Sequence, residues 1–197
     1  MSEIRAATLF DLPGAYRVCL QTGDSGRDAT SMYRDPDLLG HVYVGPYIVG
    51  QPDLALVISD RDGVGGYLLA AEDTREFGAW AEAHWWPALR LRYPASEGDS
   101  ADDQVIRLLH APPRSPDIVV ADYPAHLHVD LLPRLQGHSH GRALVGTLLV
   151  ALRARASPGV HLEVGADNGN AIAFYRHLGF TELERSEASL FMGMRLS

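Results

Sequence analysis

Polar and apolar side chains alternate strictly between residues 125 and 132, where the sequence reads AHLHVDLL. Successive side chains of a strand point to opposite faces, so His126, His128 and Asp130 share one face. A central strand of an α/β protein is normally apolar on both faces, so this polar face indicates a cleft. Asp130 is our candidate general base, because burial beside an apolar cleft would raise its pKa. A structural aspartate, bonded to backbone or to His128, is an equally good interpretation.

Histidines at positions 126, 128, 138 and 140 also suggest a metal site. An H-x-H pair, however, follows automatically from strand alternation, and neither a cysteine nor a clear third ligand supports zinc. The single cysteine, Cys19, excludes a disulfide framework and a Cys-rich zinc site. We therefore predict that the chain holds no metal.

A second candidate site lies where this strand gives way to a helix, in the segment PRLQGHSHGR at residues 133–142. A helix start presents unpaired backbone N–H groups and the positive end of the helix dipole, which suit a phosphate or pyrophosphate. Strand-to-helix junctions of other α/β proteins share some of these features, but small residues at 137, 139 and 141 would let an anion approach closely. The segment lacks the Gly-Lys-Ser/Thr ending of a Walker loop. The residues assigned to this loop are Gln136, Gly137, His138, Ser139, His140, Gly141 and Arg142.

Hydrophobic periodicity predicts the elements that would position these residues. Two apolar runs joined by Asp60-Arg61-Asp62-Gly63 indicate a hairpin, since Asp-Gly favours a tight turn. Strands are predicted at 4–6, 54–59, 64–71, 125–131, 160–164 and 190–196. Helices are predicted at 8–20, 72–91, 103–110, 141–156 and 171–178. The apolar stretch 42–49 cannot be assigned to a helix or a strand from its pattern.

Length and composition indicate one globular unit. We expect residues 1–197 to form a single domain with a helical insert at about 72–116, which carries three tryptophans. A formal net charge of −8 argues against a surface for nucleic acid or anionic membrane. The N-terminus lacks signal-peptide character and no apolar run approaches the roughly 20 residues that span a bilayer, so we expect a cytoplasmic protein without membrane contact. An exposed tryptophan in the insert would favour a homodimer.

Pro133, Gln136, Ser139 and Gly141 resemble the central motif of the GNAT acetyltransferase superfamily. In that motif a strand and a proline precede Q/R-x-x-G-x-G/A at the start of a helix. The departure is Ser139, where the family usually has glycine. A side chain there would cost affinity if the backbone needs a positive φ, whereas its hydroxyl could instead donate to a phosphate.

A second motif of the superfamily follows about 30 residues later. The family pattern is an asparagine, an alanine three residues on, an aromatic-Tyr pair and then Gly-Phe. The matching residues here are Asn168, Ala171, Phe174-Tyr175 and Gly179-Phe180. The resemblance implies that Asn168, Ala171 and Tyr175 contact the cofactor, acetyl-CoA.

The resemblance implies an α/β (α+β) fold with a mixed, mostly antiparallel twisted sheet flanked by helices. Its central strands would splay apart to admit pantetheine, whose amides would pair with the backbone of Leu131 and Leu132. Tyr175 would reprotonate the departing CoA thiolate, because a phenol with an unperturbed pKa of about 10 stays protonated at neutral pH. A core tyrosine is the alternative. Asp130 would deprotonate the acceptor amine.

A closer resemblance rests on residues 125–132, the loop Thr22-Gly23-Asp24-Ser25-Gly26, and Glu163-Val164 before the second motif. These segments look like the acetyltransferase-like C-terminal domain of O-GlcNAc hydrolases and its stand-alone bacterial relatives. The resemblances together imply an acyltransferase that moves an acetyl group from CoA to an unidentified acceptor, with an amine as first choice. The alternative is a catalytically inactive pseudo-acetyltransferase that binds acyl-CoA or a protein partner.

The acceptor itself is not identified by the sequence. Asp24, Asp28 and His128 are candidates to contact it, although aspartates in an early loop are commonly solvated. The acidic stretch from Glu97 to Asp103 would permit a basic histone-like peptide without requiring one. A small-molecule or peptide amine therefore remains the expected acceptor.

Overall fold

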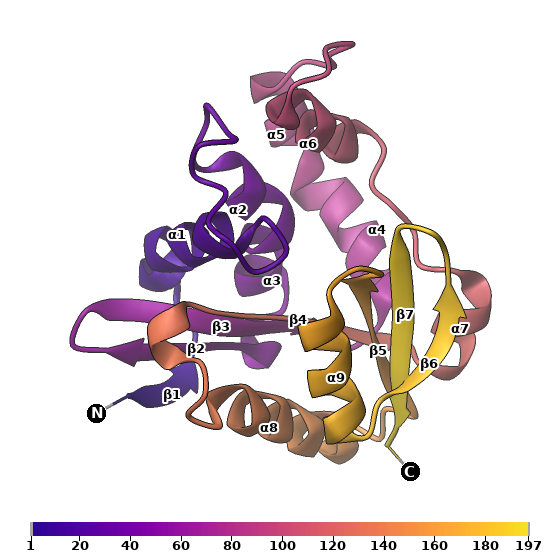
Figure 1. Ribbon diagram of the computed structural model, residues 1–197. Coiled ribbons are helices and arrows are strands. Elements are labelled where there is room, and N and C mark those ends of the chain that lie inside the picture. Colours follow the sequence, from indigo (N-terminus) through magenta and orange to yellow (C-terminus); the bar gives the residue numbers. More distant parts are fainter. Residues whose placement is uncertain (1, 197) are drawn as a thin grey trace.

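The computed structural model describes residues 2–196, and a seven-stranded sheet runs through it (Figure 1). The strand order is β1-β2-β3-β4-β5-β7-β6, and only β4 and β5 are parallel neighbours. The strands are β1 (Glu3–Ala6), β2 (Ala55–Asp60), β3 (Gly63–Ala71), β4 (Ala125–Leu131), β5 (Gly159–Gly165), β6 (Thr181–Arg185) and β7 (Ser189–Arg195). This mixed, mostly antiparallel sheet confirms the predicted fold class.

Helices cover both faces of the sheet, with α1 to α6 on one face and α8 and α9 on the other (Figure 1). The α-helices are α1 (Leu12–Thr22), α2 (Leu38–Tyr43), α3 (Gly45–Gly50), α4 (Thr74–His84), α5 (Trp86–Arg92), α6 (Ala101–His110), α7 (Asp117–Asp122), α8 (His140–Ala154) and α9 (Gly169–Leu178). Three short 3₁₀ turns are η1 (Leu9–Asp11), η2 (Pro52–Leu54) and η3 (Pro133–Leu135).

Strand β3 separates two hydrophobic cores. Tyr67 and Leu69 pack with the α1–α6 side, whereas Leu68 and Ala70 pack with the α8–α9 side. Because side chains alternate along a strand, a central strand that is apolar on both faces serves both cores. The hairpin turn before β3 uses Gly63 at φ +94°, a left-handed conformation that favours glycine, as the Asp-Gly signal predicted.

The expected single helix at 72–91 is two helices, α4 and α5. Pro87 lies in the first turn of α5, where a missing N–H is harmless, so the first helix ends before it. Trp86 is buried, and Trp80 and Trp85 are half-buried against the core of the α1–α6 side. None of these three side chains is exposed, so the premise for a homodimer is not met.

The parallel pair β4 and β5 separates soon after it begins. Their register contains only Ala125 with Val160 and His126 with His161, although β4 continues to Leu131 and β5 to Gly165. The predicted splay of the central strands is therefore present. Within residues 2–196, the β5-facing edge of β4 therefore has no strand partner beyond His126.

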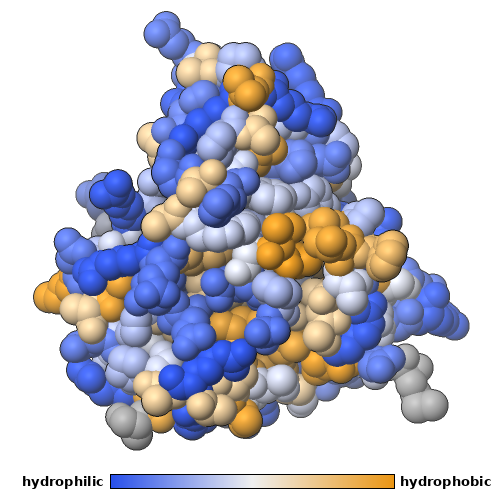
Figure 2. All heavy atoms as spheres, turned by 180° about the vertical axis from the view of Figure 1, so that it is seen from behind, coloured by the Kyte–Doolittle hydropathy of each residue, from blue (hydrophilic) through white to orange (hydrophobic). Residues whose placement is uncertain are grey.

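The surface seen from behind is mostly hydrophilic; its largest group of hydrophobic side chains lies right of the centre, and smaller groups lie elsewhere on this face (Figure 2). Within residues 2–196, the helices are too short or too polar for any of them to span a bilayer.

Candidate functional site

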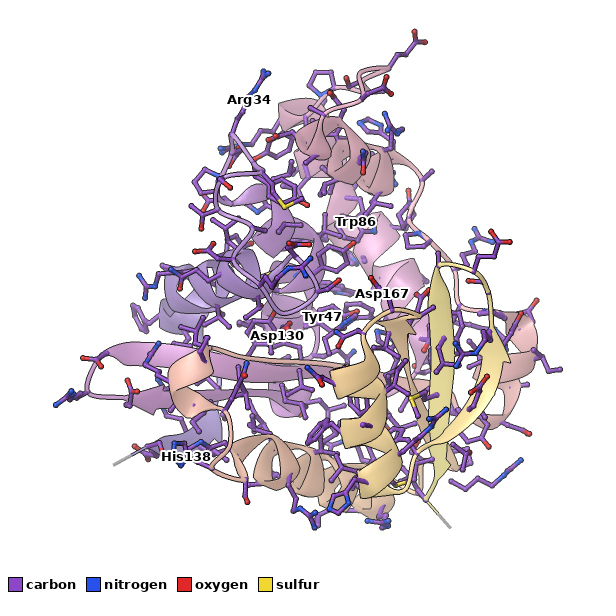
Figure 3. All side chains as sticks on the ribbon, in the orientation of Figure 1. Arg34, Tyr47, Trp86, Asp130, His138 and Asp167 are labelled. Atoms are coloured by element: carbon purple, nitrogen blue, oxygen red, sulfur yellow. The ribbon has the colours of Figure 1, made fainter. Side chains whose placement is uncertain are left out.

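A cleft of about 1150 Å³ opens where β4 and β5 diverge. Its walls come from the end of α1 and the loop after it, α2, α6, β3, β4, β5, the loop before α8, and α9. Asp130 and Tyr47 lie on the side of the sheet covered by α1 to α3, and Asp167 lies where β5 turns toward α9 (Figure 3). Segments far apart in the sequence thus meet at the splayed strands.

The loop before α8 presents a run of free amides. The backbone N–H groups from Gly137 to Arg142 donate to no acceptor within residues 2–196. Gly137 and Ser139 have left-handed backbones, at φ +76° and +62°, and left-handed residues of this kind turn amides into an anion-binding concavity. The positive end of the α8 dipole adds to the attraction. These residues therefore fit the pyrophosphate of CoA.

Side chains at both ends of the loop before α8 hold it in place by hydrogen bonds. Gln136 Nε2 donates to the carbonyl of Leu131 at 2.8 Å, and His140 Nδ1 donates to the carbonyl of Leu135 at 2.9 Å. Gly141 sits under Phe174 of α9, and a Cβ atom added at Gly141 would lie 3.1 Å from the Phe174 ring. The loop is therefore fixed in place before any ligand arrives, which reduces the entropy lost on binding.

The asparagine motif has a local structural cause. Asn168 is the N-cap of α9, and its Oδ1 accepts a hydrogen bond from the backbone N–H of Ala171 at 3.1 Å. Helix N-caps favour asparagine for this reason, which explains the spacing of three residues. Gly179 ends the helix with φ +99°. The motif thus sets the orientation of α9 and of the cleft residues on it.

Tyr175 lies on α9 and its hydroxyl opens to the cleft. The side chain is buried, yet its hydroxyl makes no hydrogen bond within residues 2–196 and is not sealed from solvent. Burial, helped by the nearby negative charge of Asp130, raises the pKa of Tyr175. The phenol therefore stays protonated at neutral pH and can donate a proton.

Asp130 lies on β4 below the cleft. Tyr67 Oη donates to Asp130 Oδ2 at 2.7 Å, and Oδ1 has no partner within residues 2–196. Burial raises the pKa of Asp130, while the nearby hydroxyl groups of Tyr67 and Thr22 act in the opposite direction. One oxygen of this carboxylate is held by a hydrogen bond and the other can accept a proton from a group in the cleft, an arrangement that suits a general base.

The two histidines of β4 share one partner, Tyr47. Its hydroxyl lies 2.8 Å from His126 Nε2 and 2.9 Å from His128 Nε2. His126 Nδ1 lies 2.8 Å from Thr74 Oγ1, so both nitrogens of His126 are occupied. Within residues 2–196, no three side chains of the metal-ligating types lie close enough together to hold a metal ion.

Most of the residues predicted for the site meet in this one cleft. The predicted residues that line it are His128, Asp130, Leu131, Gln136, Gly137, Ser139, His140, Gly141, Arg142, Asn168, Ala171 and Tyr175.

Leu132, His138, Asp24 and Asp28 do not line the cleft. The Leu132 side chain packs in the core and its N–H donates to the Gly65 carbonyl at 2.8 Å, so that amide is not free for pantetheine. Arg27 Nε donates to Asp24 Oδ2 at 2.9 Å, and the backbone N–H of Thr30 donates to Asp28 Oδ1. These two aspartates shape the loop after α1.

Sequence reasoning missed Tyr43, Tyr47 and Tyr67 as site residues. Tyr43 and Tyr47 lie in the stretch that could not be typed, and Tyr67 reaches Asp130 through the β3–β4 register. A hydrophobic pattern does not reveal which strands are neighbours. The Gly65-Gly66 pair before Tyr67 was the available signal, because paired glycines in a strand mark a close approach of another chain segment.

Comparisons with known proteins agree with this fold. The model of the acetyltransferase (GNAT) family matches residues 59–180. The crystal structure of SsHAT is 37% identical, has a TM-score of 0.92, and the match covers 100% of this chain and 98% of that one. The structure of yncA from Salmonella typhimurium with its cofactor acetyl-CoA is 16% identical, has a TM-score of 0.60 and covers 100% and 94% of the two chains, and at this identity it shows the fold alone.

Two curated relatives are longer proteins. Protein O-GlcNAcase from Rattus norvegicus and from Mus musculus are each 26% identical to this chain over 181 residues, which is 90% of this chain. The match covers 20% of each relative, so the chain spans about a fifth of their length.

Proposed function

The chain belongs to the acetyltransferase (GNAT) family, and we propose that it transfers the acetyl group of acetyl-CoA directly to an amine. The run of free amides from Gly137 to Arg142 carries most weight, because it lies at the start of α8 beside an open strand edge. Such a run suits a pyrophosphate, and an open edge suits the amides of pantetheine.

The donor would lie along the splay between β4 and β5. The amides of the loop before α8 would hold the pyrophosphate, and the free edge of β4 up to Leu131 would pair with pantetheine as an added strand does. Acetyl-CoA supplies the activated thioester. The protein would hold that thioester in line with the acceptor and so lower the entropic part of the barrier.

Two residues would move the protons. Asp130 would take a proton from the acceptor amine through its free Oδ1, and Tyr175 would give its proton to the sulfur that leaves. A carbon–nitrogen bond forms as the carbon–sulfur bond breaks, so the products are an acetamide and CoA. The proton taken by Asp130 and the one lost by Tyr175 balance after exchange with water.

A second candidate function is acyl-CoA binding without turnover. The left-handed φ of Ser139 is the observation behind it, because strain beside the pyrophosphate would displace the bound thioester from Asp130 and Tyr175. The two candidates differ in whether CoA is released from bound acetyl-CoA.

The test is to incubate the protein with acetyl-CoA and a panel of primary amines and to detect acetylated amine by mass spectrometry. The panel contains glucosamine, tyramine, spermidine and lysine methyl ester. We expect acetylated product and free CoA in equal amounts from at least one amine. Binding of acetyl-CoA without product from any amine or from water would support the second candidate instead.

A further inference from the structure

Four side chains form a continuous line of hydrogen bonds that ends in the cleft. Thr74 at the start of α4 contacts His126, which contacts Tyr47 of α3, which contacts His128. The three distances, from Thr74 Oγ1 to His126 Nδ1 and onward through the Tyr47 hydroxyl, are 2.8, 2.8 and 2.9 Å. None of these contacts is needed for holding acetyl-CoA, so the line calls for its own explanation.

The carbonyl at one end fixes the direction of the first hydrogen bond. Thr74 Oγ1 lies 2.7 Å from the carbonyl oxygen of Pro124, and a carbonyl can only accept. The single hydroxyl proton of Thr74 therefore points to Pro124. The oxygen of Thr74 must accept from His126, so the proton of a neutral His126 is on Nδ1.

That assignment propagates along the line. Burial lowers the pKa of His126 well below its ordinary value, and the neighbouring His128 and His161 act in the same direction, so His126 is neutral. Its Nε2 then carries no proton and must accept from the Tyr47 hydroxyl. Tyr47 has no second proton, so its oxygen accepts from Nε2–H of His128.

The Nδ1 atom of His128 is therefore bare, that is, it carries no proton. That nitrogen has no hydrogen-bond partner within residues 2–196, and His128 lines the cleft. His41 Nε2 is the one buried polar side-chain atom of the described residues that is sealed from solvent without a partner. Nδ1 of His128 is consequently open to the cleft as a hydrogen-bond acceptor.

The surroundings keep His128 uncharged. Burial, with the nearby His161, lowers the pKa of His128 to about 4, so the ring is neutral at physiological pH. The titratable groups around it on the packed elements are Tyr43, Tyr47, His126, Asp130 and His161, and Glu163 lines the same cleft. No group in this set places a second proton on the ring at neutral pH.

We propose that Nδ1 of His128 accepts a hydrogen bond from the reacting N–H group of the acceptor amine, and that Thr74, His126 and Tyr47 are positioning residues that fix this tautomer. The inference rests on the proposed acetyl transfer to an amine. His128 lies two residues from Asp130 on the same face of β4, so one amine nitrogen would be oriented by His128 and deprotonated by Asp130. An acceptor that presents only lone pairs to His128 would be rejected, because the bare nitrogen would lose its partner.

The tautomer is tested by nitrogen-15 NMR of histidine side chains in the free protein, without any substrate. We expect a protonated Nε2 and a bare Nδ1 at His128 from pH 6 to 8. Tyr47→Phe and Thr74→Val should disturb this state, whereas Thr74→Ser should preserve it. A protonated Nδ1 in the wild type, or the same spectrum in Tyr47→Phe, would overturn the relay.

The role toward substrate is tested by two opposite substitutions. His128→Asn keeps an acceptor oxygen near the position of Nδ1 and loses the donor to Tyr47. His128→Gln keeps a donor near the position of Nε2 and loses the acceptor in the cleft. We expect CoA release in the amine assay to fall about tenfold more in His128→Gln than in His128→Asn. The reverse order would show that His128 serves only to hold Tyr47.

Two controls separate this inference from the proposed function. The exposed His84→Gln on α4 should leave CoA release unchanged, and the KM for acetyl-CoA should be the same in all the His128 variants. If the wild type binds acetyl-CoA and releases no CoA, acetyl transfer fails and the substrate role of His128 fails with it. The spectra then still decide whether the relay exists.

Discussion

Tyr67 and Asp130 are direct partners in the register of β3 and β4, and the Tyr67 hydroxyl donates to the Asp130 carboxylate at 2.7 Å. Burial raises the pKa of Tyr67 well above its ordinary value, so this hydroxyl keeps its proton and remains a donor. The bond fixes one carboxylate oxygen and leaves the other toward the cleft. A strand pairing that builds the sheet therefore also orients the candidate base.

Asp130→Asn should change how stability depends on pH. The pKa of Asp130 is raised in the folded protein, so between the unfolded and folded pKa values the folded state holds more protons. The free energy of unfolding therefore falls as pH rises from about 4, the unfolded pKa, through the folded pKa. Because Asp130→Asn lacks that titration, its free energy of unfolding should fall less than that of the wild type between pH 4.5 and 7.5.

Urea unfolding at the two pH values measures this difference, with the exposed Asp99→Asn as the control. The amide oxygen that Asp130→Asn introduces can still accept a hydrogen bond from Tyr67, so the fold should be retained. An identical pH dependence in wild type and Asp130→Asn would contradict a raised pKa.

Tyr175→Phe should slow acetyl transfer while acetyl-CoA still binds. General acid catalysis contributes roughly 10²- to 10⁴-fold, so kcat should fall by about that factor with the Kd for acetyl-CoA unchanged. The raised pKa of Tyr175 also means that the wild type should show no loss of rate from this group below about pH 10, the ordinary pKa of a phenol. Tyr123→Phe, outside the cleft, is the control. An equal loss of kcat in the two variants would contradict the general-acid role of Tyr175.

Gly141→Ala and Gly146→Ala should change different properties of the protein, although both lie in α8. A Cβ at Gly141 would lie 3.1 Å from the Phe174 ring beside the free amides, whereas a Cβ at Gly146 would meet no atom of residues 2–196 within 4 Å. Alanine at Gly146 should stabilise the helix by about 1 kcal/mol. Gly141→Ala should instead weaken acetyl-CoA binding in calorimetry, and unchanged affinity would show that the contact with Phe174 does not position the loop.

Ser139→Gly should relieve backbone strain. A left-handed conformation costs a non-glycine residue about 1 to 2 kcal/mol. Glycine removes this cost, but its greater conformational entropy in the unfolded state reduces the gain by about 0.5 to 1 kcal/mol. The net gain in the free energy of unfolding should be about 0.5 to 1 kcal/mol. Ala156→Gly, at φ +56° and away from the cleft, should give a similar gain.

Acetyl-CoA affinity distinguishes these two glycine variants. If the strain at Ser139 opposes anion binding, Ser139→Gly should tighten binding several-fold and Ala156→Gly should not. Weaker binding by Ser139→Gly would mean that the serine hydroxyl donates to a phosphate.

Local patterns in the sequence predicted much of the fold. Alternation between 125 and 132 located β4, and the Asp-Gly turn located the β2–β3 hairpin. Strand β6 was missed because its side chains are mainly exposed on an edge, so its sequence has no buried face to reveal it. The helix at 72–91 was predicted without its break, although Pro87 marks the point where α5 begins.

The site was predictable where its chemistry lies within one segment. The loop amides at 137–142 and the cap between Asn168 and Ala171 depend on residues close in sequence. The line from Thr74 through Tyr47 to His128 joins three separate elements, so only the fold reveals it. The same holds for Tyr67 beside Asp130.

Calorimetric titration with acetyl-CoA and with acetyl-pantetheine, which lacks the pyrophosphate, tests most directly whether the loop from Gly137 to Arg142 holds that group. We predict that acetyl-CoA binds with at least tenfold higher affinity and that added salt narrows the difference, because the attraction is partly electrostatic. Equal affinities for the two compounds, or no heat from acetyl-CoA at millimolar concentration, would contradict the assignment of this cleft.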